Sequence, residues 1–278
     1  MVATNSYMDR FETFNPRWEA GIEAMEATQL TLQGNLVAGS ERIAYHVPPL
    51  ECSDASDRYS NNKAFANLLG VVTLPDDSLK LSESCAKYAG FTAWKNHDFG
   101  LYYQNSIDFV ADNNVMIENK NGLFGIMNGP SATGHQYAQK TMNITNNVFV
   151  GQTSSFDCSI DIAPSNDHNF ELSGNSRPSL SPFNSGMVGL VFPNFYQGSN
   201  KAPLKPFKGC MSYNAIGGLM TLSGNTFAKY GTSSCNTNYA VSTNVGNDDG
   251  QHPVEAELST VIDTPHANKI VYHRPNVG

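Results

Sequence analysis

An all-β fold is predicted for this chain by three features of its sequence. Charged residues make up only 15% of the 278 residues, whereas Gly and Asn are plentiful, a composition closer to turn-rich β proteins than to helical enzymes. Short runs of alternating apolar residues recur, and each is followed by Asn or Gly. A Gly followed by an aliphatic residue recurs between these runs.

The recurrence predicts stacked coils rather than hairpins. The Gly-aliphatic pairs are Gly21-Ile22, Gly70-Val71, Gly100-Leu101, Gly125-Ile126, Gly189-Leu190 and Gly218-Leu219, and the apolar runs are residues 30–39, 115–127, 142–151 and 219–230. A single short strand cannot bury its apolar face, but stacked coils bury a continuous stripe at about 4.8 Å per coil. We therefore expect one right-handed parallel β-helix domain over residues 1–278, with Asn side chains stacked in ladders at the turns.

Two alternatives bear on this assignment. Residues 18–30 (WEAGIEAMEATQL) have helical propensity, but they contain Gly21-Ile22 at the position of a repeat pair, so we expect a strand. A β-sandwich would also use Asn and Gly in turns, but the runs lack the two-residue Asn-Gly spacing of tight hairpins.

Long polar insertions interrupt the repeat. They are rich in Ser, Asn, Asp, Gly and Pro, which marks loops. They cover residues 48–60, 74–90, 128–141 and 159–185, with a tail at 231–259. In a solenoid such loops project from the coils, often on one face, where partners bind.

Charge and hydropathy exclude two classes of partner. The 25 acidic and 17 basic residues give a net charge of −8, and no basic cluster is present, so we expect no nucleic-acid partner. No run approaches the ~20 apolar residues of a membrane-spanning helix. The first residues lack a secretory signal, so any export signal would lie upstream.

The five cysteines favour disulfides over metal or redox chemistry. They are Cys52, Cys85, Cys158, Cys210 and Cys235. None forms a C-x-x-C pair, which argues against a zinc ribbon or a thioredoxin-like motif, although buried free thiols remain an alternative. Cys52 and Cys85 flank the coil around residues 62–74 and are the expected pair. The odd number leaves one thiol free or paired outside this chain.

Acidic and imidazole side chains are the only catalytic candidates, because parallel β-helices often carry carboxylate clusters that cleave polysaccharides. His97 and Asp98 are adjacent, so on a strand they point to opposite faces and converge only at a turn. Asp157 and Asp161 share one face of a strand, but Cys158 between them favours disulfide packing. The segment NDDGQH (residues 247–252), with Asp248, Asp249 and His252, lacks the ligand spacing of a calcium loop.

No nucleophile elbow, metalloprotease motif, phosphate loop or dinucleotide fingerprint is present, so we expect neither a cofactor nor a metal, and no catalysis. Asn143-Ile144-Thr145 is an N-glycosylation sequon. Trp94, Tyr102 and Tyr103 are the aromatics that would form an exposed platform in a carbohydrate-binding module.

Six stretches, in residues and in order, resemble the fibrocystin family. They are GNLVAGSERIAYHV (34–47), FTAWKNHDFGLYY (91–103), VGQTSSFDC (150–158), GLVFPNF (189–195), GGLMTLSGNTFAKY (217–230) and NKIVYHRPNVG (268–278). The resemblance covers almost the whole chain. It implies a piece of the extracellular β-helix region of a very large protein, anchored in the membrane by a segment outside this chain and associated with cilia or related projections.

The resemblance also implies a function. We expect a non-catalytic structural or recognition scaffold at the cell surface whose partners are other extracellular proteins or glycans. More distant relatives with this architecture are linked to hyaluronan degradation, so a polysaccharide hydrolase or lyase is the alternative, and a carbohydrate-binding module is a third possibility.

Overall fold

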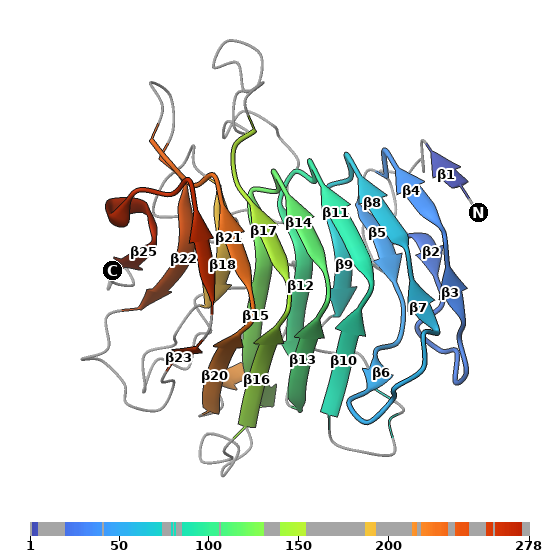
Figure 1. The fold of residues 1–278 in the computed structure, drawn as a ribbon. Coiled ribbons are helices and arrows are strands. Elements are labelled where there is room, and N and C mark those ends of the chain that lie inside the picture. Colours follow the sequence, from blue (N-terminus) through green and yellow to red (C-terminus); the bar gives the residue numbers. More distant parts are fainter. Residues whose placement is uncertain are drawn as a thin grey trace.

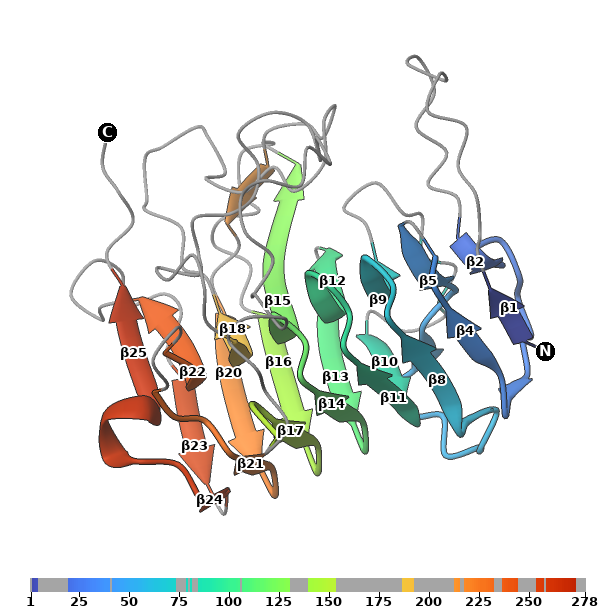
Figure 2. The same ribbon diagram turned by 90° about the horizontal axis from the view of Figure 1, so that it is seen from above.

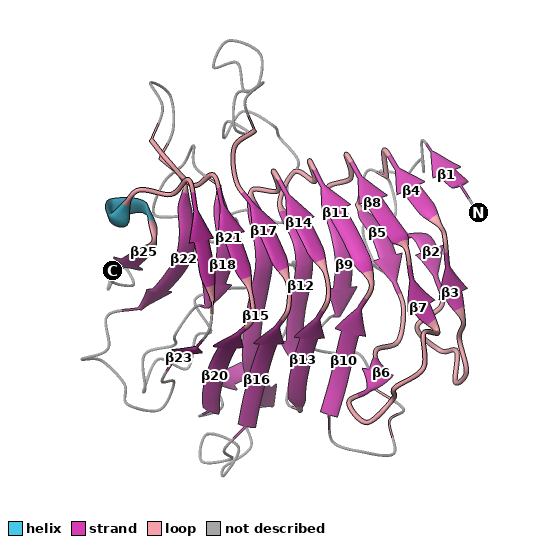
Figure 3. Ribbon diagram, viewed as in Figure 1, coloured by secondary structure: helices cyan, strands magenta, loops and turns pink. Residues whose placement is uncertain are grey.

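Stacked coils of short strands form the fold, and the computed structural model of the chain is the expected parallel β-helix (Figure 1). The structure describes residues 2–4, 20–40, 42–73, 79, 81, 85–105, 107–130, 140–153, 187–192, 213–215, 218–232, 237–244, 254–257 and 259–273. Strands dominate these residues (Figure 3). No helix among them is long and apolar enough to cross a membrane.

Three long sheets run along the rod, and strands of successive coils pair in parallel within each. Sheet A contains β1 (Val2–Thr4), β4 (Leu36–Ala38), β8 (Asn62–Phe65), β11 (Phe91–Trp94), β14 (Val115–Ile117), β17 (Val148–Val150), β21 (Thr226–Ala228) and β24 (Thr260–Ile262). Sheet B contains β2 (Ala20–Glu23), β5 (Ile43–His46), β9 (Leu69–Thr73), β12 (Phe99–Asn105), β15 (Asn121–Pro130), β18 (Val188–Phe192), β22 (Tyr239–Asn244) and β25 (Ile270–His273), with β19 (Tyr213–Ala215) antiparallel to β15. Figure 2 shows these strands following one another along the rod.

Sheet D completes each coil between sheets B and A. It contains β6 (Leu50–Glu51), β10 (Cys85–Ala89), β13 (Asp108–Asp112), β16 (Lys140–Thr145), β20 (Gly218–Ser223) and β23 (Val254–Glu257). Its edge strand β6 pairs antiparallel with β10. The two-stranded sheet C pairs β3 (Leu32–Gln33) with β7 (Tyr59–Ser60), and η2 (His266–Asn268) is one 3-10 turn.

Left-handed backbone corners flank most strands of sheet A. The first corner leads into sheet A from sheet D, or from sheet C in the first two coils, and its residues with positive φ are Gly34, Asn61, Gly90, Asn113, Asn146 and Gly224. The second corner leads from sheet A into sheet B, and its residues with positive φ are Gly39, Ala66, Lys95, Glu118, Lys229 and Asp263. Non-glycine residues pay a conformational penalty in this region, so other contacts hold these corners.

Those contacts are ladders of buried Asn side chains, as predicted. At the second corner, Nδ2 of Asn67 donates to Oδ1 of Asn96 (3.0 Å), and Nδ2 of Asn96 donates to Oδ1 of Asn119 (2.9 Å). The same Oδ1 atoms accept the backbone N–H of the neighbouring coil, at 3.0 Å in both cases. At the first corner, Asn114, Asn147 and Asn225 repeat the arrangement. Each amide is both donor and acceptor, so the ladder extends from coil to coil.

The interior is a set of apolar columns that follow the strand alternation. Val37, Ala64, Ala93, Met116, Phe149 and Phe227 occupy the central, inward position of successive sheet A strands and are at most 2% exposed. Phe149 and Phe227 stack at 4.9 Å between ring centroids. Stacking like on like in this way buries a continuous stripe, which no single coil achieves.

A column of glycines explains most of the Gly-aliphatic repeat. Gly21, Gly70, Gly100, Gly122 and Gly189 each precede an inward apolar residue of sheet B, and a Cβ at Gly100 would lie 2.6 Å from the carbonyl oxygen of Gly122. At each of these five glycines a Cβ would lie less than 3.0 Å from an atom of a neighbouring coil, whereas Ala44 and Ala240 hold the same column in two other coils.

Two of the predicted pairs are not part of this column. On β15 the residue in register with Leu101 is Leu123, so the column uses Gly122-Leu123 and not Gly125-Ile126. Gly218-Leu219 belongs to sheet D. The long strand β15 contains two Gly-aliphatic pairs, and the sequence does not show which of them joins the column.

Four of the predicted insertions and tails also require correction. Residues 85–89, expected in a loop, form β10, and the expected tail at 231–259 contains β22 and β23. Strands β15 and β16 extend into both ends of the 128–141 insertion, and 48–60 contains β6 and β7. Residues 159–185 lie outside the described part of the chain. The strand expected within 18–30 is confirmed as β2.

Replacing one Asn of a ladder is expected to destabilise the fold, and the loss should grow with the number of buried polar groups that lose a hydrogen bond. Asn96→Ala leaves the buried backbone N–H of Asn67 without its acceptor and removes one of the two donors to Oδ1 of Asn119, so we expect a loss of about 2–3 kcal/mol in the free energy of unfolding. Asn35→Ala, which removes the part-buried hydrogen bond from Asn35 to Asn62 at the first corner, is the matched control and is expected to cost about 1 kcal/mol. Urea unfolding measures both, and equal losses would contradict a cooperative role for the ladder.

Candidate recognition surfaces

Sheet B is buried on both of its faces from β5 through β18. Its inward residues line the solenoid, and its outward residues in these strands are also at most 3% exposed: Ile43, Leu69, Val72, Phe99, Tyr102, Phe124, Val188 and Val191. Phe99, Tyr102 and Phe124 pack with ring centroids 5.1 to 5.3 Å apart. Continuous apolar runs such as Val188–Phe192 are typical of a sheet covered on both sides, so these strands offer no open binding face. At the end of the sheet, Ile270 of β25 is 49% exposed.

Sheet D presents a polar outer face. Oδ1 of Asp108 accepts hydrogen bonds from N (2.6 Å) and Oγ1 (3.2 Å) of Thr141 in the next coil. Asp112 accepts one from Oγ1 of Thr145 at 2.8 Å. Both carboxylates therefore form hydrogen bonds between neighbouring strands, which stabilise the sheet.

Asn143 lies in the middle of this polar face. Its residue is partly exposed, and its Oδ1 accepts a hydrogen bond from Oγ1 of Thr221 at 2.7 Å. Its flanking residues Met142 and Ile144 point into the core. The sequon therefore directs its Asn outward, away from the packed interior.

Sheet A presents an apolar outer face. The residues after the inward column are in register and partly exposed or exposed, and we call them the sheet A stripe: Ala38, Phe65, Trp94, Ile117, Val150, Ala228 and Ile262. Phe65 and Trp94 stack at 4.7 Å with an interplanar angle of 24°. The sequence signal for this stripe is a three-residue strand with every position apolar, as in Val115–Ile117 and Val148–Val150. Figure 1 shows the strands that carry the stripe side by side.

The aromatic platform that a carbohydrate-binding module would expose is not formed by Trp94, Tyr102 and Tyr103. Tyr102 and Tyr103 are both 0% exposed, and Tyr103 stacks inside the solenoid on Phe109 at 3.9 Å. Trp94 alone of the three is partly exposed, with one ring face against Phe65. The sequence does not show that the tyrosines are buried, because a run of apolar residues does not reveal that both faces of its strand are covered.

His97 and Asp98 lie at a second corner, where the chain turns from sheet A into sheet B. Their side chains meet, with Nδ1 of His97 3.3 Å from Oδ1 of Asp98, and they are 26% and 9% exposed. The turn therefore brings together two residues that a straight strand would separate. Among the described residues no group of three or more His, Cys, Asp or Glu side chains is arranged to hold a metal ion.

The other predicted site residues lie outside the described ranges. They are Asp157, Asp161, Asp248, Asp249 and His252, together with Cys158, Cys210 and Cys235. The structure does describe Cys52 and Cys85, and it joins them in a disulfide with Cα atoms 5.5 Å apart. This is the pair expected from the sequence.

The loop beside the disulfide is held by polar contacts. Arg58 forms an ion pair with Asp54, whose Oδ1 also accepts the backbone N–H of Ser56 at 2.7 Å. Side-chain hydrogen bonds from Ser56 and then from Arg58 lower the pKa of Asp54 to about 2. The carboxylate therefore stays ionised at neutral pH and keeps the loop closed.

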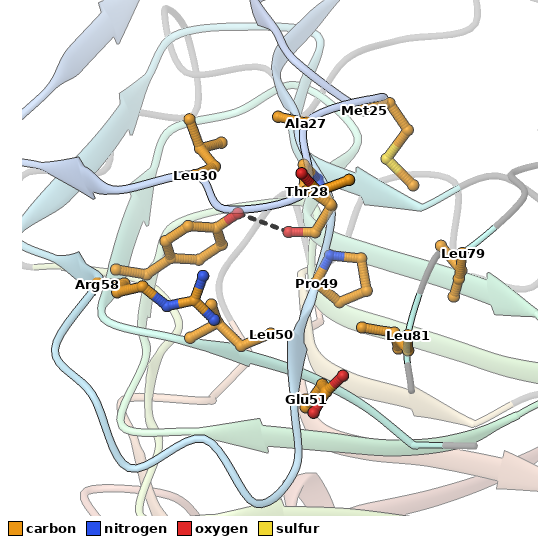
Figure 4. Close-up of a pocket in the computed structure, with 12 residues that line it drawn as sticks. Met25, Ala27, Thr28, Leu30, Pro49, Leu50, Glu51, Arg58, Leu79 and Leu81 are labelled. Carbon is orange, nitrogen blue, oxygen red and sulfur yellow. Dashed lines mark hydrogen bonds between the residues drawn. The ribbon is translucent and has the colours of Figure 1, made fainter. Parts of the chain in front are cut away.

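A small pocket lies next to this loop (Figure 4). Its lining is mostly apolar, including Met25, Leu30, Leu50 and Leu79, and Tyr59 closes one side by donating to the carbonyl of Pro48 at 2.6 Å. The cavity measures about 70 Å³, whereas sites for small organic ligands are typically ~300–1,000 Å³. The pocket is thus a gap in packing and not a ligand site.

Comparison with known proteins gives relatives of much greater length. The chain is 33% identical over 281 residues to fibrocystin-L of Homo sapiens, and this match covers 100% of the chain and 6% of that protein. Fibrocystin-L of Mus musculus matches equally, and fibrocystin of Canis lupus familiaris is 30% identical over 92% of the chain. The chain spans about 6% of the length of these relatives. No family model matches the chain, and no solved structure matches it.

Loss of the Cys52–Cys85 disulfide is expected to destabilise the N-terminal coils. The two residues are 33 positions apart, and closing a loop of that length is worth ~3–4 kcal/mol in the chain-entropy account. The double variant Cys52→Ser with Cys85→Ser should lower the unfolding midpoint in urea accordingly. Peptide mapping of the unreduced protein should yield the linked peptides, whereas alkylation of both thiols without reductant would refute the pairing.

Proposed function

Because the chain belongs to the fibrocystin family, as a homologue of one segment of its members, we propose that it is a rigid, non-catalytic scaffold segment of a large extracellular protein. Residues 1–278 would form a single β-helix domain that sets recognition surfaces and loops at fixed intervals. The parent protein would stand at the cell surface, on cilia or similar projections, held by a membrane anchor outside this chain.

The continuity of the coil stack is the observation that carries this proposal. Sheet A pairs in parallel from β1 through β24 without a break in strand order. Amide ladders join successive coils at both corners. Bending such a rod would break buried hydrogen bonds and open the apolar interior, so stiffness follows from the packing.

The arrangement of acidic side chains supports a non-catalytic role. Asp108 and Asp112 are engaged by threonines of the next coil, and Asp98 is 6% exposed in contact with its neighbour His97. Glycoside hydrolysis needs two carboxyl groups about 5–10 Å apart across an open sugar site. The carboxyl groups of Asp98, Asp108 and Asp112 are engaged in contacts within the fold instead.

The disulfide supports an extracellular location. Such bonds persist in oxidising compartments and are rare in the cytosol, and Cys52–Cys85 closes a loop at the surface of the rod. Other extracellular proteins or glycans are therefore the proposed partners.

An assay for polysaccharide cleavage tests the non-catalytic role. Purified chain incubated with hyaluronan, chondroitin and pectin, with and without calcium, is expected to leave polymer size unchanged. Depolymerisation that disappears in Asp157→Asn or Asp161→Asn would establish the hydrolase or lyase alternative, because the amide removes the charge and the proton transfer while preserving shape.

Asn143 is the proposed glycosylation site, supported by its outward position on sheet D. Chain secreted from mammalian cells should lose mass on treatment with an N-glycosidase. Asn143→Gln should abolish that loss, while the matched variant Thr145→Ser, which keeps the sequon, should retain it. An unchanged mass in the wild-type chain would disprove the assignment.

A further inference from the structure

We propose that the C-terminal end of the coil stack is covered by one further β-helix coil, formed by polypeptide that follows this chain in its parent protein. The last described coil consists of β23, β24 and β25, and it lies at the end of the rod opposite β1 (Figure 2). The inference rests on the proposed role as a segment of a larger protein, and it names what this end of the segment packs against.

The core of the last coil is open. Its inward residues are in register with buried core residues of the coil before, as follows: Ala256 with Leu222, Val261 with Phe227, and Ile270 with Val241. Ala256 is nevertheless exposed, and Val261 and Ile270 are 38% and 49% exposed. An inward apolar residue of each of the three long sheets therefore faces solvent at this end.

This exposure is confined to one end of the rod. In the first coils, Ile22 of β2 is partly buried and packs against the core, as do Ala24 and Leu30. Among the described residues, the most exposed large apolar side chains are Val261, Ile262 and Ile270. All three belong to the last coil, so the uncovered apolar surface gathers where the stack ends.

The backbone of this coil shows what kind of partner fits. Strands β23, β24 and β25 are each the last described strand of their sheet. In β24, the N–H of Thr260 and the carbonyl of Ile262 bond to Asn225 and Lys229 of the coil before, at 2.7 and 3.1 Å. Because alternate residues of a parallel strand bond to opposite sides, the N–H and carbonyl of Val261 face away from the stack. Such an edge recruits another strand.

Three adjacent edges require a whole coil. A single added strand would extend one sheet and leave the core between the sheets open. A coil that follows the order of sheets D, A and B adds a strand to each sheet and sets an apolar residue about 4.8 Å above each open core position. The compact coil of β13, β14 and β15 makes this circuit within residues 108–130.

Charge and packing argue against a second copy of the chain at this end. The described acidic and basic side chains of the last coil are Glu255, Glu257, Asp263, His266 and Lys269. Two such ends facing one another would bring together two sets of carboxylates, which opposes association. A head-to-tail contact would instead use the N-terminal coil, where Ile22 already packs against its own core.

The path of the chain favours polypeptide connected to β25. Only Ser106 and Ile107 separate β12 of sheet B from β13 of sheet D, so a chain that leaves sheet B can return to sheet D at once. Polypeptide that follows β25 by the same path would arrive beside β23. The relatives offer such length, since this chain spans about 6% of them. A connected coil also acts at a high effective concentration, so a small contact suffices.

Extension of the chain tests the proposal. The chain is produced as it stands and also extended by the next residues of its natural reading frame, about 30 in number, which is the length of one repeat. Amide hydrogen exchange in peptides from β24 and β25 should slow about tenfold or more in the extended chain. Peptides from β13 and β14, in the middle of the rod, should not change. Equal exchange of β24 and β25 in both forms would overturn the proposal.

Two neighbouring substitutions locate the contact. Val261→Asp places a charge at an inward position, so it should lower the urea midpoint of the extended chain far more than that of the chain as it stands. Ile262→Asp, on the outward face of the same strand, is the matched control and should affect both forms equally. If Val261→Asp prevents folding, Val261→Thr, which adds one hydroxyl at nearly constant shape, gives the same comparison. Equal effects of the Val261 variants in both forms would refute the contact.

Two further outcomes would also overturn the proposal. Self-association in sedimentation that Val261→Asp abolishes would make a second copy the occupant. A natural polypeptide that ends within about 20 residues of Gly278 would be too short to form a coil. Unchanged exchange leaves the scaffold role standing, because polysaccharide cleavage tests that role. Cleavage activity would defeat the scaffold role whatever the exchange shows.

Discussion

The stacking of Asn side chains at the two corners of each coil is the interaction on which the rest of this structure depends. An amide side chain donates and accepts at once, so Asn96 bonds to Asn67 on one side and Asn119 on the other, and satisfies a backbone N–H as well. These bonds hold residues such as Lys95 and Glu118 in the left-handed region, which an isolated chain would avoid. Two fixed corners leave room for only a short strand between them. The central residue of that strand points inward and its neighbours point outward, which sets both the core column and the apolar stripe.

The three sheets share one coil geometry but differ in the residues on their outer faces. The strands of sheet A are short because a corner lies at each end, and their outer residues form the sheet A stripe. Sheet D carries cross-coil polar pairs such as Asp112 with Thr145. Sheet B is flanked by the longest breaks in the repeat, since the segments 131–139 and 193–212 follow β15 and β18 in sequence and 154–186 precedes β18. Its outward residues are nevertheless buried, as Val72 and Tyr102 show. Variation in length is thus concentrated beside one sheet, while the corners that build sheets D and A stay uniform.

This division suits a scaffold. A rod that must hold its shape gains from buried ladders and from close backbone contact at the column of Gly70 and Gly100, neither of which tolerates local rearrangement. The outer faces of the strands take little part in this packing. In sheet A, Trp94 and Ile117 are partly exposed, whereas Ala93 and Met116 beside them are buried in the core.

The sequence by itself determined the solenoid class, the Asn ladders, the strand at Gly21-Ile22, the disulfide partners and the fibrocystin relationship. Each of these follows from a local sequence pattern or from direct similarity to a known family. Only the tertiary structure decided which glycine of β15 joins the column, that Tyr102 and Tyr103 are buried, that His97 meets Asp98 and that sheet A has an apolar outer face. The reason is register between coils of unequal length. Stacked Asn residues are 27 positions apart for Asn35 and Asn62 but 78 apart for Asn147 and Asn225. Local spacing cannot align such coils, so the face on which a side chain lies is fixed only when the coils pack.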